Sequence, residues 1–288
     1  MPNHRTDLAL ESALQLGIAE KKAKNISGVR ILEGLHQGYT VTSVTVENEA
    51  GSQAIGRSIG TYITLDLRPY FQRQTHYFSR GVQCFSQHLR QLLPPLSNDD
   101  CVLVAGLGNR YMACDAVGPV ALDNLLVTRH MKDAAFPFQP VAAIAAGVAG
   151  QSGMEAADLI CSIVSQIAPA AVIVIDALCA RSRHRLCATV QLSDTGLTPG
   201  SGIGNHRHPI DKETLGVPVL SVGIPTVMAG AVLAEELTGA ASQPDHSLFV
   251  TPRDVDSRVR ELGRLVGYGI SAALQPQLSI EDITGLLG

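Results

Sequence analysis

The segment Ala170–Leu178, AAVIVIDAL, most constrains the fold of this chain. Apart from Asp176 it is apolar on both faces of an extended strand, which is typical of parallel sheets that helices cover on both sides. Three further short apolar runs have the same character: Cys101–Gly106, Pro140–Ile144 and Val217–Gly223. We therefore predict a sheet whose central strands are buried on both faces.

Predicted helices separate these strands along the chain. They span about Asp115–Val127 and Met154–Ile167, and a third begins near Thr226. Strands that alternate with helices predict an α/β fold, a wound, mainly parallel sheet with helices on both faces. In such folds, ligands bind beyond the carboxyl ends of the strands, near a switch in strand order. We therefore expect a functional site at that edge.

The first third of the chain has a different pattern. Residues 1–38 are polar and carry a cluster of lysines, which predicts a leader followed by a short helix. Alternating β-branched residues predict strands at Tyr39–Glu47 and Thr61–Leu67, and a third strand is predicted at Ala188–Leu192. A helix is expected over about Gly81–Leu93, before a Pro-Pro pair.

A long helix is predicted near the C-terminus. Thr251 is its expected cap, Pro252 fits its first turn, and Asp254 completes a capping box. The helix is predicted to continue to Leu274.

Composition narrows the class of protein. The chain has 288 residues, 45% hydrophobic and 17% charged, enough for one or two buried cores. The net charge of −4 provides no basic field for direct binding of nucleic acid. Six cysteines without a CxxC pair favour a reducing compartment, and no signal segment or apolar run of about 18 residues is present. We expect a soluble cytoplasmic protein that does not bind a membrane.

Two aspartates follow strands at the expected edge. Asp115 lies in the loop after the strand 101–105, and Asp176 ends the strand 171–175. Two carboxyl groups held close together titrate apart, so that one acts as an acid and the other as a base. The alternative is structural, with Asp115 capping a helix and Asp176 binding loop amides.

The loops around these strands supply further candidates. The turn-rich segment Ser193–Asn205 contains Asp194, Gly200, Gly202 and Asn205, and Asn109 belongs to the loop before Asp115. The glycines of Ser193–Asn205 could bring backbone N–H groups close to a ligand, although this segment lacks the lysine of a phosphate-binding loop.

Other chemistries have weaker support in the sequence. His206 and His208 form an HxH pair without further clustered ligands, so we predict no metal site. Cys114 has no histidine placed to activate it, and Ser182 and Ser201 lie in no GxSxG elbow.

A series of segments carries a resemblance to a known family. In chain order they are RTDLALE, AIGRSIGTYITLDL, VAGLGN, DAVGP, DNLLVTRH, GVAGQSGMEAADLI, VIDALCARS, SDTGLTPGSGIGNHRHPIDKETLGVPVLSVGIPTVM and FVTPRDVDSRVRELGRLVGYGISAAL. Together they resemble the germination proteases, spore endopeptidases that degrade small acid-soluble spore proteins.

The resemblance implies an atypical aspartic-type peptidase that uses no cofactor. The catalytic aspartates of the family fall on Asp115, within DAVGP, and on Asp176, within IDALCARS. The family fold is similar to that of the hydrogenase-maturation peptidases. The resemblance also implies a homotetramer, small acid-soluble spore proteins as substrates, and a location in the cytoplasm of the forespore or spore core.

A zymogen is a further implication of the resemblance. Family substrates are cleaved where an acidic residue precedes an apolar residue and an alanine, and the segment Thr6–Ala9 has this order. The expected self-cleavage bond joins Asp7 to Leu8. Residues 1–7 would then be a propeptide, and residues 8–288 a single α/β peptidase domain.

The chain departs from the family pattern in two places. Ala113-Cys114 stands where the family usually has Thr-Pro, and the segment Ala229–Phe249 is shorter than its counterpart. Two alternative functions remain: a nickel-dependent peptidase like those of hydrogenase maturation, and a non-enzymatic module that binds a small ligand with its GSGIGN loop.

Overall fold

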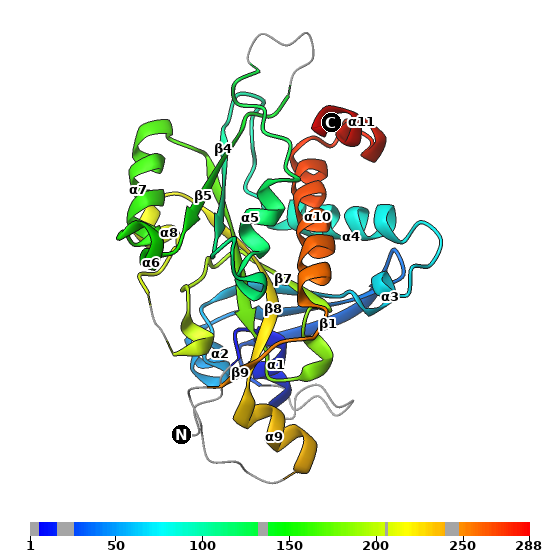
Figure 1. Ribbon diagram of the computed structural model, residues 1–288. Coiled ribbons are helices and arrows are strands. Elements are labelled where there is room, and N and C mark those ends of the chain that lie inside the picture. Colours follow the sequence, from blue (N-terminus) through cyan, green and yellow to red (C-terminus); the bar gives the residue numbers. More distant parts are fainter. Residues whose placement is uncertain (1–5, 16–25, 132–137, 205–206, 240–247) are drawn as a thin grey trace.

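The computed structural model describes residues 6–15, 26–131, 138–204, 207–239 and 248–288. Their strands form a nine-stranded sheet in the order β1-β2-β3-β7-β8-β6-β4-β5, with β9 paired to β8 (Figure 1). The strands are β1 (Val29–His36), β2 (Tyr39–Val46), β3 (Gly60–Asp66), β4 (Val102–Leu107), β5 (Val141–Gly147), β6 (Ala171–Cys179), β7 (Thr189–Ser193), β8 (Val219–Ala229) and β9 (Phe249–Val250).

Helices lie on both sides of this sheet. They are α1 (Ala9–Gln15), α2 (Glu49–Ile55), α3 (Arg68–Phe71), α4 (Tyr77–Leu92), α5 (Val117–Leu122), α6 (Ala149–Ser152), α7 (Ala156–Ile167), α8 (Lys212–Leu215), α9 (Gly230–Thr238), α10 (Val255–Leu274) and α11 (Ile280–Leu287). The described residues also form the 3-10 turns η1 (Ala113–Asp115), η2 (Arg183–Arg185) and η3 (Ser201–Ile203). In the part of the chain described, no helix is both long and apolar enough to cross a membrane.

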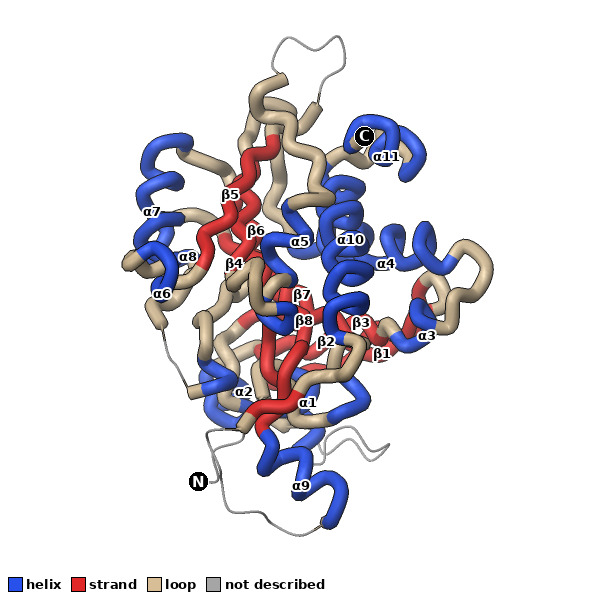
Figure 2. The backbone as a smooth tube through the Cα atoms, in the orientation of Figure 1, coloured by secondary structure: helices blue, strands red, loops and turns tan. Residues whose placement is uncertain are grey.

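The parallel half of the sheet confirms the predicted α/β fold. Strands β8, β6, β4 and β5 run parallel in this order. Val172 and Val174 of β6 belong to the core on the α7 side, whereas Ile173 and Ile175 belong to the core that contains α4 and α10. Figure 2 shows the strands between these two groups of helices. The central strand is therefore apolar because helices cover both of its faces.

The other half of the sheet is antiparallel. Strands β7, β3, β2 and β1 alternate in direction, and β7 joins them to β8. Helix α1 packs on this half, where Ala9 and Leu10 contact a core formed with Val44, Val46 and Tyr62. The sheet is thus mixed, and the N-terminal segment is anchored on its antiparallel part.

The short helix predicted within residues 1–38 is α1, whereas most of the predicted leader lies outside the described residues. Val29–His36 form a strand instead of leader or helix, and this strand pairs with β2 across the turn Gln37-Gly38. Both turn residues have positive φ, as the type I′ turn of a two-residue hairpin requires. The strand lies at the edge of the sheet, so most of its side chains are exposed, including those of Leu32 and Leu35.

The helix predicted from near Thr226 begins later than expected. Strand β8 continues through Thr226 to Ala229, and α9 begins at Gly230. The Thr226 hydroxyl is fully buried and donates to the Cys114 carbonyl oxygen at 2.5 Å. This contact holds the residue in the extended strand.

The predicted capping box of the C-terminal helix is wrong, although its end at Leu274 is correct. The Thr251 hydroxyl donates to the Thr226 carbonyl oxygen at 2.8 Å instead of capping α10. Asp254 is the N-cap residue but makes no side-chain cap, and it pairs with Arg258 at 2.8 Å. A capping box does occur at Ser279, at the start of α11.

A close backbone approach fixes α5 against β4. A Cβ atom added to Gly118 would lie 2.3 Å from the Leu107 carbonyl oxygen and 2.6 Å from the Leu107 nitrogen. Gly106 faces the same contact, since its added Cβ would lie 2.8 Å from the carbonyl carbon of Gly118. Only glycine fits at this crossing, which also sets the position of the loop before α5.

We predict that Gly118→Ala destabilises the fold by about 1–3 kcal/mol, because the new methyl group must displace the backbone of β4. The unfolding midpoint in urea measures the loss. Gly285→Ala is the matched control, since nothing lies within 4 Å of the Cβ position at Gly285 in α11. Equal losses of stability in the two variants would contradict the close-contact explanation.

Candidate active site

Asp176 lies on β6 directly after the last residue of this strand that pairs with β4. Ile175 is the last residue of β6 that pairs with β4, while Asp176 pairs with Gly223 of β8 on the other side. Its side chain is 7% exposed and accepts a hydrogen bond from the N–H of Ala177 at 2.9 Å. Burial disfavours the charged form and raises the pKa of Asp176 well above its usual value.

Asp115 ends the turn η1 and enters the same region from the loop after β4. Its Oδ2 accepts a hydrogen bond from the Asn109 N–H at 2.8 Å. It does not cap α5, because Ala116 is the N-cap residue of that helix. Burial raises the pKa of Asp115, and the Asn109 N–H opposes this by stabilising the carboxylate.

Backbone contacts hold the Asp115 loop in place. Gly108 has a φ of 98°, and an added Cβ there would lie 2.0 Å from the Asp115 carbonyl oxygen. The Thr226 hydroxyl binds the carbonyl oxygen of the preceding residue, Cys114. The loop is thus fixed at both of its ends to the sheet.

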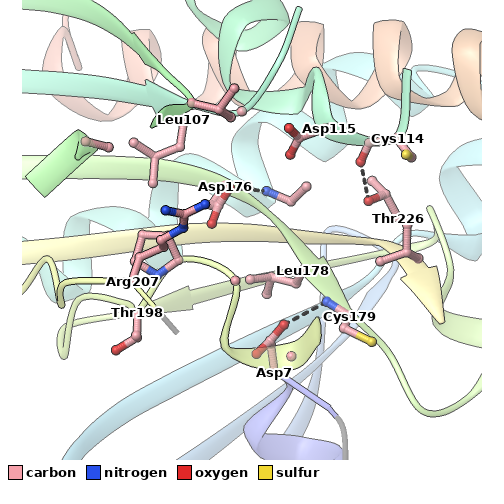
Figure 3. A pocket seen from close by; sticks show the side chains of 18 of the residues that line it. Asp7, Leu107, Cys114, Asp115, Asp176, Leu178, Cys179, Thr198, Arg207 and Thr226 are labelled. Atoms are coloured by element: carbon pink, nitrogen blue, oxygen red, sulfur yellow. Dashed lines mark hydrogen bonds between the residues drawn. The ribbon is translucent and has the colours of Figure 1, made fainter. Parts of the chain in front are cut away.

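Both carboxyl groups line one cavity of about 350 Å³ (Figure 3). The negative charge of Asp115 further raises the pKa of Asp176. Much of the cavity wall is apolar, with contributions from Leu107, Met112, Val148, Ala156, Leu178, Val227 and Phe249. Asp176 is therefore the member of the pair that keeps its proton to higher pH. Acid–base catalysis by two carboxyl groups requires such a difference between their pKa values.

Asp7 lies in the wall of this cavity. Its carboxylate accepts hydrogen bonds from the Cys179 N–H and from the Ser201 hydroxyl, each at 2.8 Å. Its own N–H donates to the Cys179 carbonyl oxygen at 2.9 Å, so the N-terminal segment pairs with the end of β6. An added Cβ at Gly202 would lie 2.1 Å from the Asp7 carboxylate, and only glycine leaves room for it.

Leu8 follows Asp7 into an apolar pocket. Its side chain is 0% exposed and packs in a cluster with Leu178, Leu186 and Met228. The Asp7 carbonyl oxygen accepts a hydrogen bond from Gln191 Nε2 at 3.2 Å.

The peptide between Asp7 and Leu8 is not hydrogen-bonded to either candidate carboxyl group in the described residues. Leu178 lines both the cavity of the pair and a neighbouring cavity of about 310 Å³, and Asp7 also lines both. Figure 3 shows Leu178 between Asp7 and the carboxyl pair.

The structure divides the other predicted loop residues. Gly200 and Gly202 line the cavity, and Asn109 supports Asp115 from behind. Asp194 does not belong to the site, because it accepts a hydrogen bond from the Thr61 N–H at 2.7 Å between β7 and β3. Asn205 lies outside the described residues.

No cluster of three or more histidine, cysteine or acidic side chains suited to a metal ion occurs in the described parts of the chain. His208 lines the cavity, but it faces Asp158 at 3.6 Å, and His206 lies outside the described residues. Burial raises the pKa of the Cys114 thiol, which disfavours a thiolate nucleophile.

Sequence reasoning missed several side chains of the site. Ser201 holds the Asp7 carboxylate, and Gln191 binds the backbone of Asp7 and of Ala9. Arg207 also lines the cavity, paired with Glu155 at 2.9 Å. The available signal was Gln191 itself, a polar residue that stands between Val190 and Leu192 in a strand that is buried throughout.

The fold and the cavity define the class: an α/β protein that presents two carboxyl groups of raised pKa at the carboxyl edge of its parallel strands. A family model described as germination protease matches residues 5–238. The chain belongs to the germination protease family and is therefore a peptidase, a hydrolase of peptide bonds.

Individual relatives match along the whole chain. A germination protease of Clostridium perfringens is 34% identical over 330 residues, with 100% of both chains covered. Another, from Bacillus cereus, is 32% identical over 353 residues and covers 98% of this chain and 96% of the relative. These alignments are longer than the 288-residue chain, so the relatives contain residues that this chain lacks.

A solved structure gives a weaker match. The [NiFe] hydrogenase maturation protease HycI of Thermococcus kodakarensis is 16% identical, with a TM-score of 0.36, and the match covers 64% of this chain and 98% of that chain. A likeness at this level supports no conclusion about the site.

We predict that Asp176→Asn makes the protein more stable than the wild type as pH rises above the usual carboxyl pKa. The folded wild type holds the Asp176 proton to higher pH than the unfolded chain, so its stability falls through the interval between these two pKa values. The asparagine variant lacks this slope. Urea unfolding between pH 4 and pH 8 measures it.

Asp282→Asn is the control of opposite sign. Hydrogen bonds from Ser279 lower the pKa of Asp282, so the stability it contributes is present above the usual carboxyl pKa and is lost as pH falls. An unchanged slope in Asp176→Asn would show that the buried carboxyl group ionises normally.

Proposed function

We propose that this chain is an endopeptidase that degrades small acid-soluble spore proteins during germination and removes its own leader. The bond cleaved in the leader joins Asp7 to Leu8, and Asp115 and Asp176 form the acid–base pair. Residues 1–7 are then the propeptide of a single peptidase domain formed by residues 8–288.

The position of Asp7 carries this proposal. Its carboxylate is bound in the wall of the cavity that contains Asp115 and Asp176, and the next side chain, Leu8, is buried in an apolar pocket. A chain that binds its own acidic–apolar sequence beside a carboxyl pair carries a copy of the sequence that it cleaves.

The unequal pKa values assign the chemical roles. Asp115, with the lower pKa, removes a proton from a water molecule as the water oxygen attacks the carbonyl carbon of the scissile bond. Asp176, with the higher pKa, donates its proton to the leaving nitrogen. Transfer of the proton from Asp115 to Asp176 then restores the pair, and the reaction consumes one water.

The uncut chain is restrained by its side chains near the scissile bond. Leu178 lies between Asp7 and the carboxyl pair, and Gln191 holds the Asp7 carbonyl oxygen on the side of the neighbouring cavity. Cleavage requires Leu178 to move aside so that the carbonyl carbon can meet the activated water. The position of Leu178 thus keeps the zymogen from cutting itself.

Recognition uses the same contacts in substrates. The Cys179 N–H and the Ser201 hydroxyl select an acidic side chain before the scissile bond, and the pocket of Leu186 and Met228 selects an apolar one after it. The names of the relatives support a role in germination. The forespore or spore core as location and a homotetrameric assembly are part of the proposal through the family resemblance.

We predict that Asp115→Asn and Asp176→Asn each slow leader removal and peptide hydrolysis by at least about 100-fold, the usual contribution of a general acid or base. Intact mass after incubation at mildly acidic pH reports the loss of residues 1–7. Asp194→Asn, which changes a carboxyl group outside the cavity, is the matched control and retains activity. Full activity in either variant of the pair would exclude the acid–base assignment.

We predict that Ser201→Ala reduces the preference for an acidic residue before the scissile bond roughly 10-fold, because a carboxylate loses one of two charge-assisted hydrogen bonds. The ratio of kcat/KM for peptides with Asp and with Asn at this position measures the preference. Ser162→Ala, on the outer face of α7, is the control. If Ser201→Ala lowers kcat/KM for both peptides equally, Ser201 does not recognise the carboxylate of the residue before the scissile bond.

A further inference from the structure

Gln191 makes two hydrogen bonds to the N-terminal segment, one on each side of the Leu8 residue. Its Nε2 donates to the Asp7 carbonyl oxygen at 3.2 Å, and its Oε1 accepts from the Ala9 N–H at 2.8 Å. The second contact fixes the direction of the amide, because a backbone N–H can donate only to the oxygen end. The NH2 group therefore points at the carbonyl oxygen of the bond that we propose is cut.

The sheet holds this amide rigidly. Gln191 is 7% exposed and lies in β7 between Val190 and Leu192, which are both fully buried. Its backbone is paired on both sides, with Thr64 of β3 and with Gly223 of β8. A donor that is fixed in this way needs no reorganisation when charge develops on the atom that it faces.

Gln191 lies in the same row of the sheet as the proposed acid. Gly223 pairs with Gln191 on one side and with Asp176 on the other. Side chains of directly paired residues share a face of the sheet, and neighbouring strands lie about 4.8 Å apart, so the Cα atoms of the amide and the acid are roughly 10 Å apart.

The space between the amide and the acid lies over a glycine, and Leu178 fills it. A Cβ atom added to Gly223 would lie 2.2 Å from Leu178 Cδ1. Leu178 also lines both the cavity that contains Asp176 and the cavity that contains Gln191. When Leu178 moves aside, the scissile peptide can enter this space with its oxygen at Gln191 and its carbonyl carbon towards Asp176.

The proposed acid–base pair leaves one developing charge without a partner. As the water oxygen bonds to the carbonyl carbon and its proton passes to Asp115, the π electrons of the carbonyl group move onto the carbonyl oxygen. Asp176 protonates the leaving nitrogen, so neither carboxyl group neutralises this oxyanion. A neutral amide can stabilise it by donating a hydrogen bond, and it does not lower the pKa values of the carboxyl pair as a cation would.

We propose that Gln191 is a catalytic residue whose Nε2–H stabilises the oxyanion formed at the scissile carbonyl group. The proposal rests on the function proposed above and adds a third catalytic side chain to it. The bond of 3.2 Å is at the long end of the N–H···O range and shortens as the oxygen gains charge. When the intermediate collapses, the electron pair on the oxygen re-forms the C=O bond and the C–N bond breaks, while Gln191 transfers no proton.

Gln191→Met tests the role, because methionine keeps a long, unbranched side chain but has no donor. The self-processed enzyme is assayed with a peptide that has the sequence of residues 4–15. We expect kcat to fall about 100- to 1,000-fold, the loss for one oxyanion donor, and KM to change by less than about 10-fold. An unchanged kcat with a raised KM would overturn the proposal, because Gln191 would then only hold the peptide. No cleavage of this peptide by the wild type would instead count against the proposed function.

Gln139→Met is the matched control. Gln139 is also partly buried, and its amide donates to the backbone oxygens of Ser97 and Asp100, but it lines neither cavity of the proposed site. We expect the kcat and KM of the wild type. A fall in kcat equal to that of Gln191→Met would show that loss of a buried amide acts through the fold, and this would overturn the catalytic role.

A measurement on the wild type covers the case in which Gln191→Met does not fold. A second peptide carries an ester in place of the amide between Leu8 and Ala9, so it lacks the N–H that orients the Gln191 amide. We expect kcat for this peptide to be roughly 10-fold lower, the value of about one hydrogen bond. A raised KM with unchanged kcat would overturn the proposal. In Gln191→Met the ester should leave kcat unchanged, because both changes act through one amide, and additive losses would also overturn it.

Discussion

The structure depends on one costly arrangement, a carboxyl group buried in the apolar centre of a parallel sheet. β6 is apolar up to Asp176, and its pairing with β4 ends one residue earlier, at Ile175. The Asp176 side chain therefore faces a cavity rather than a packed core. An isolated charge there would be strongly destabilising, and burial therefore raises the pKa of Asp176 well above its usual value. Asp115 is the partner that carries the charge more easily, because the Asn109 N–H supports it.

The seven residues that begin at Asp176 organise most of the site. The strand presents the buried carboxyl group, and its last backbone groups pair with Asp7. The turn that follows offers its N–H groups to Glu11. Because backbone groups make most of these contacts, the N-terminal segment is positioned by the path of the chain as much as by particular side chains. The proposed acid and the groups that bind both carboxylates of the N-terminal segment thus belong to one stretch of chain.

The central sheet could be predicted from the sequence because strands that helices cover on both faces are almost continuously apolar, and in β6 only Asp176 interrupts the apolar run. β1 escaped prediction, since an exposed edge strand shows little apolar alternation. Thr226 was misplaced because its strand conformation depends on a contact with Cys114 that is distant in the chain. Ser201 and Gln191 acquire their roles through Asp7, more than 180 residues away, and no local pattern records such a contact.

Backbone contacts hold the loop that carries Asp115, and the side chains of Ala113 and Cys114 add apolar packing against the main core. The Thr226 hydroxyl donates a hydrogen bond to the Cys114 carbonyl oxygen. Gly108 and Gly118 have no side chain, so the backbone packs directly against neighbouring backbone at both positions. Any residue that adopts the local turn leaves those contacts unchanged. A change of side chain at Ala113 or Cys114 therefore leaves these backbone contacts in place, whereas a side chain at Gly108 or Gly118 would collide with the backbone that it faces.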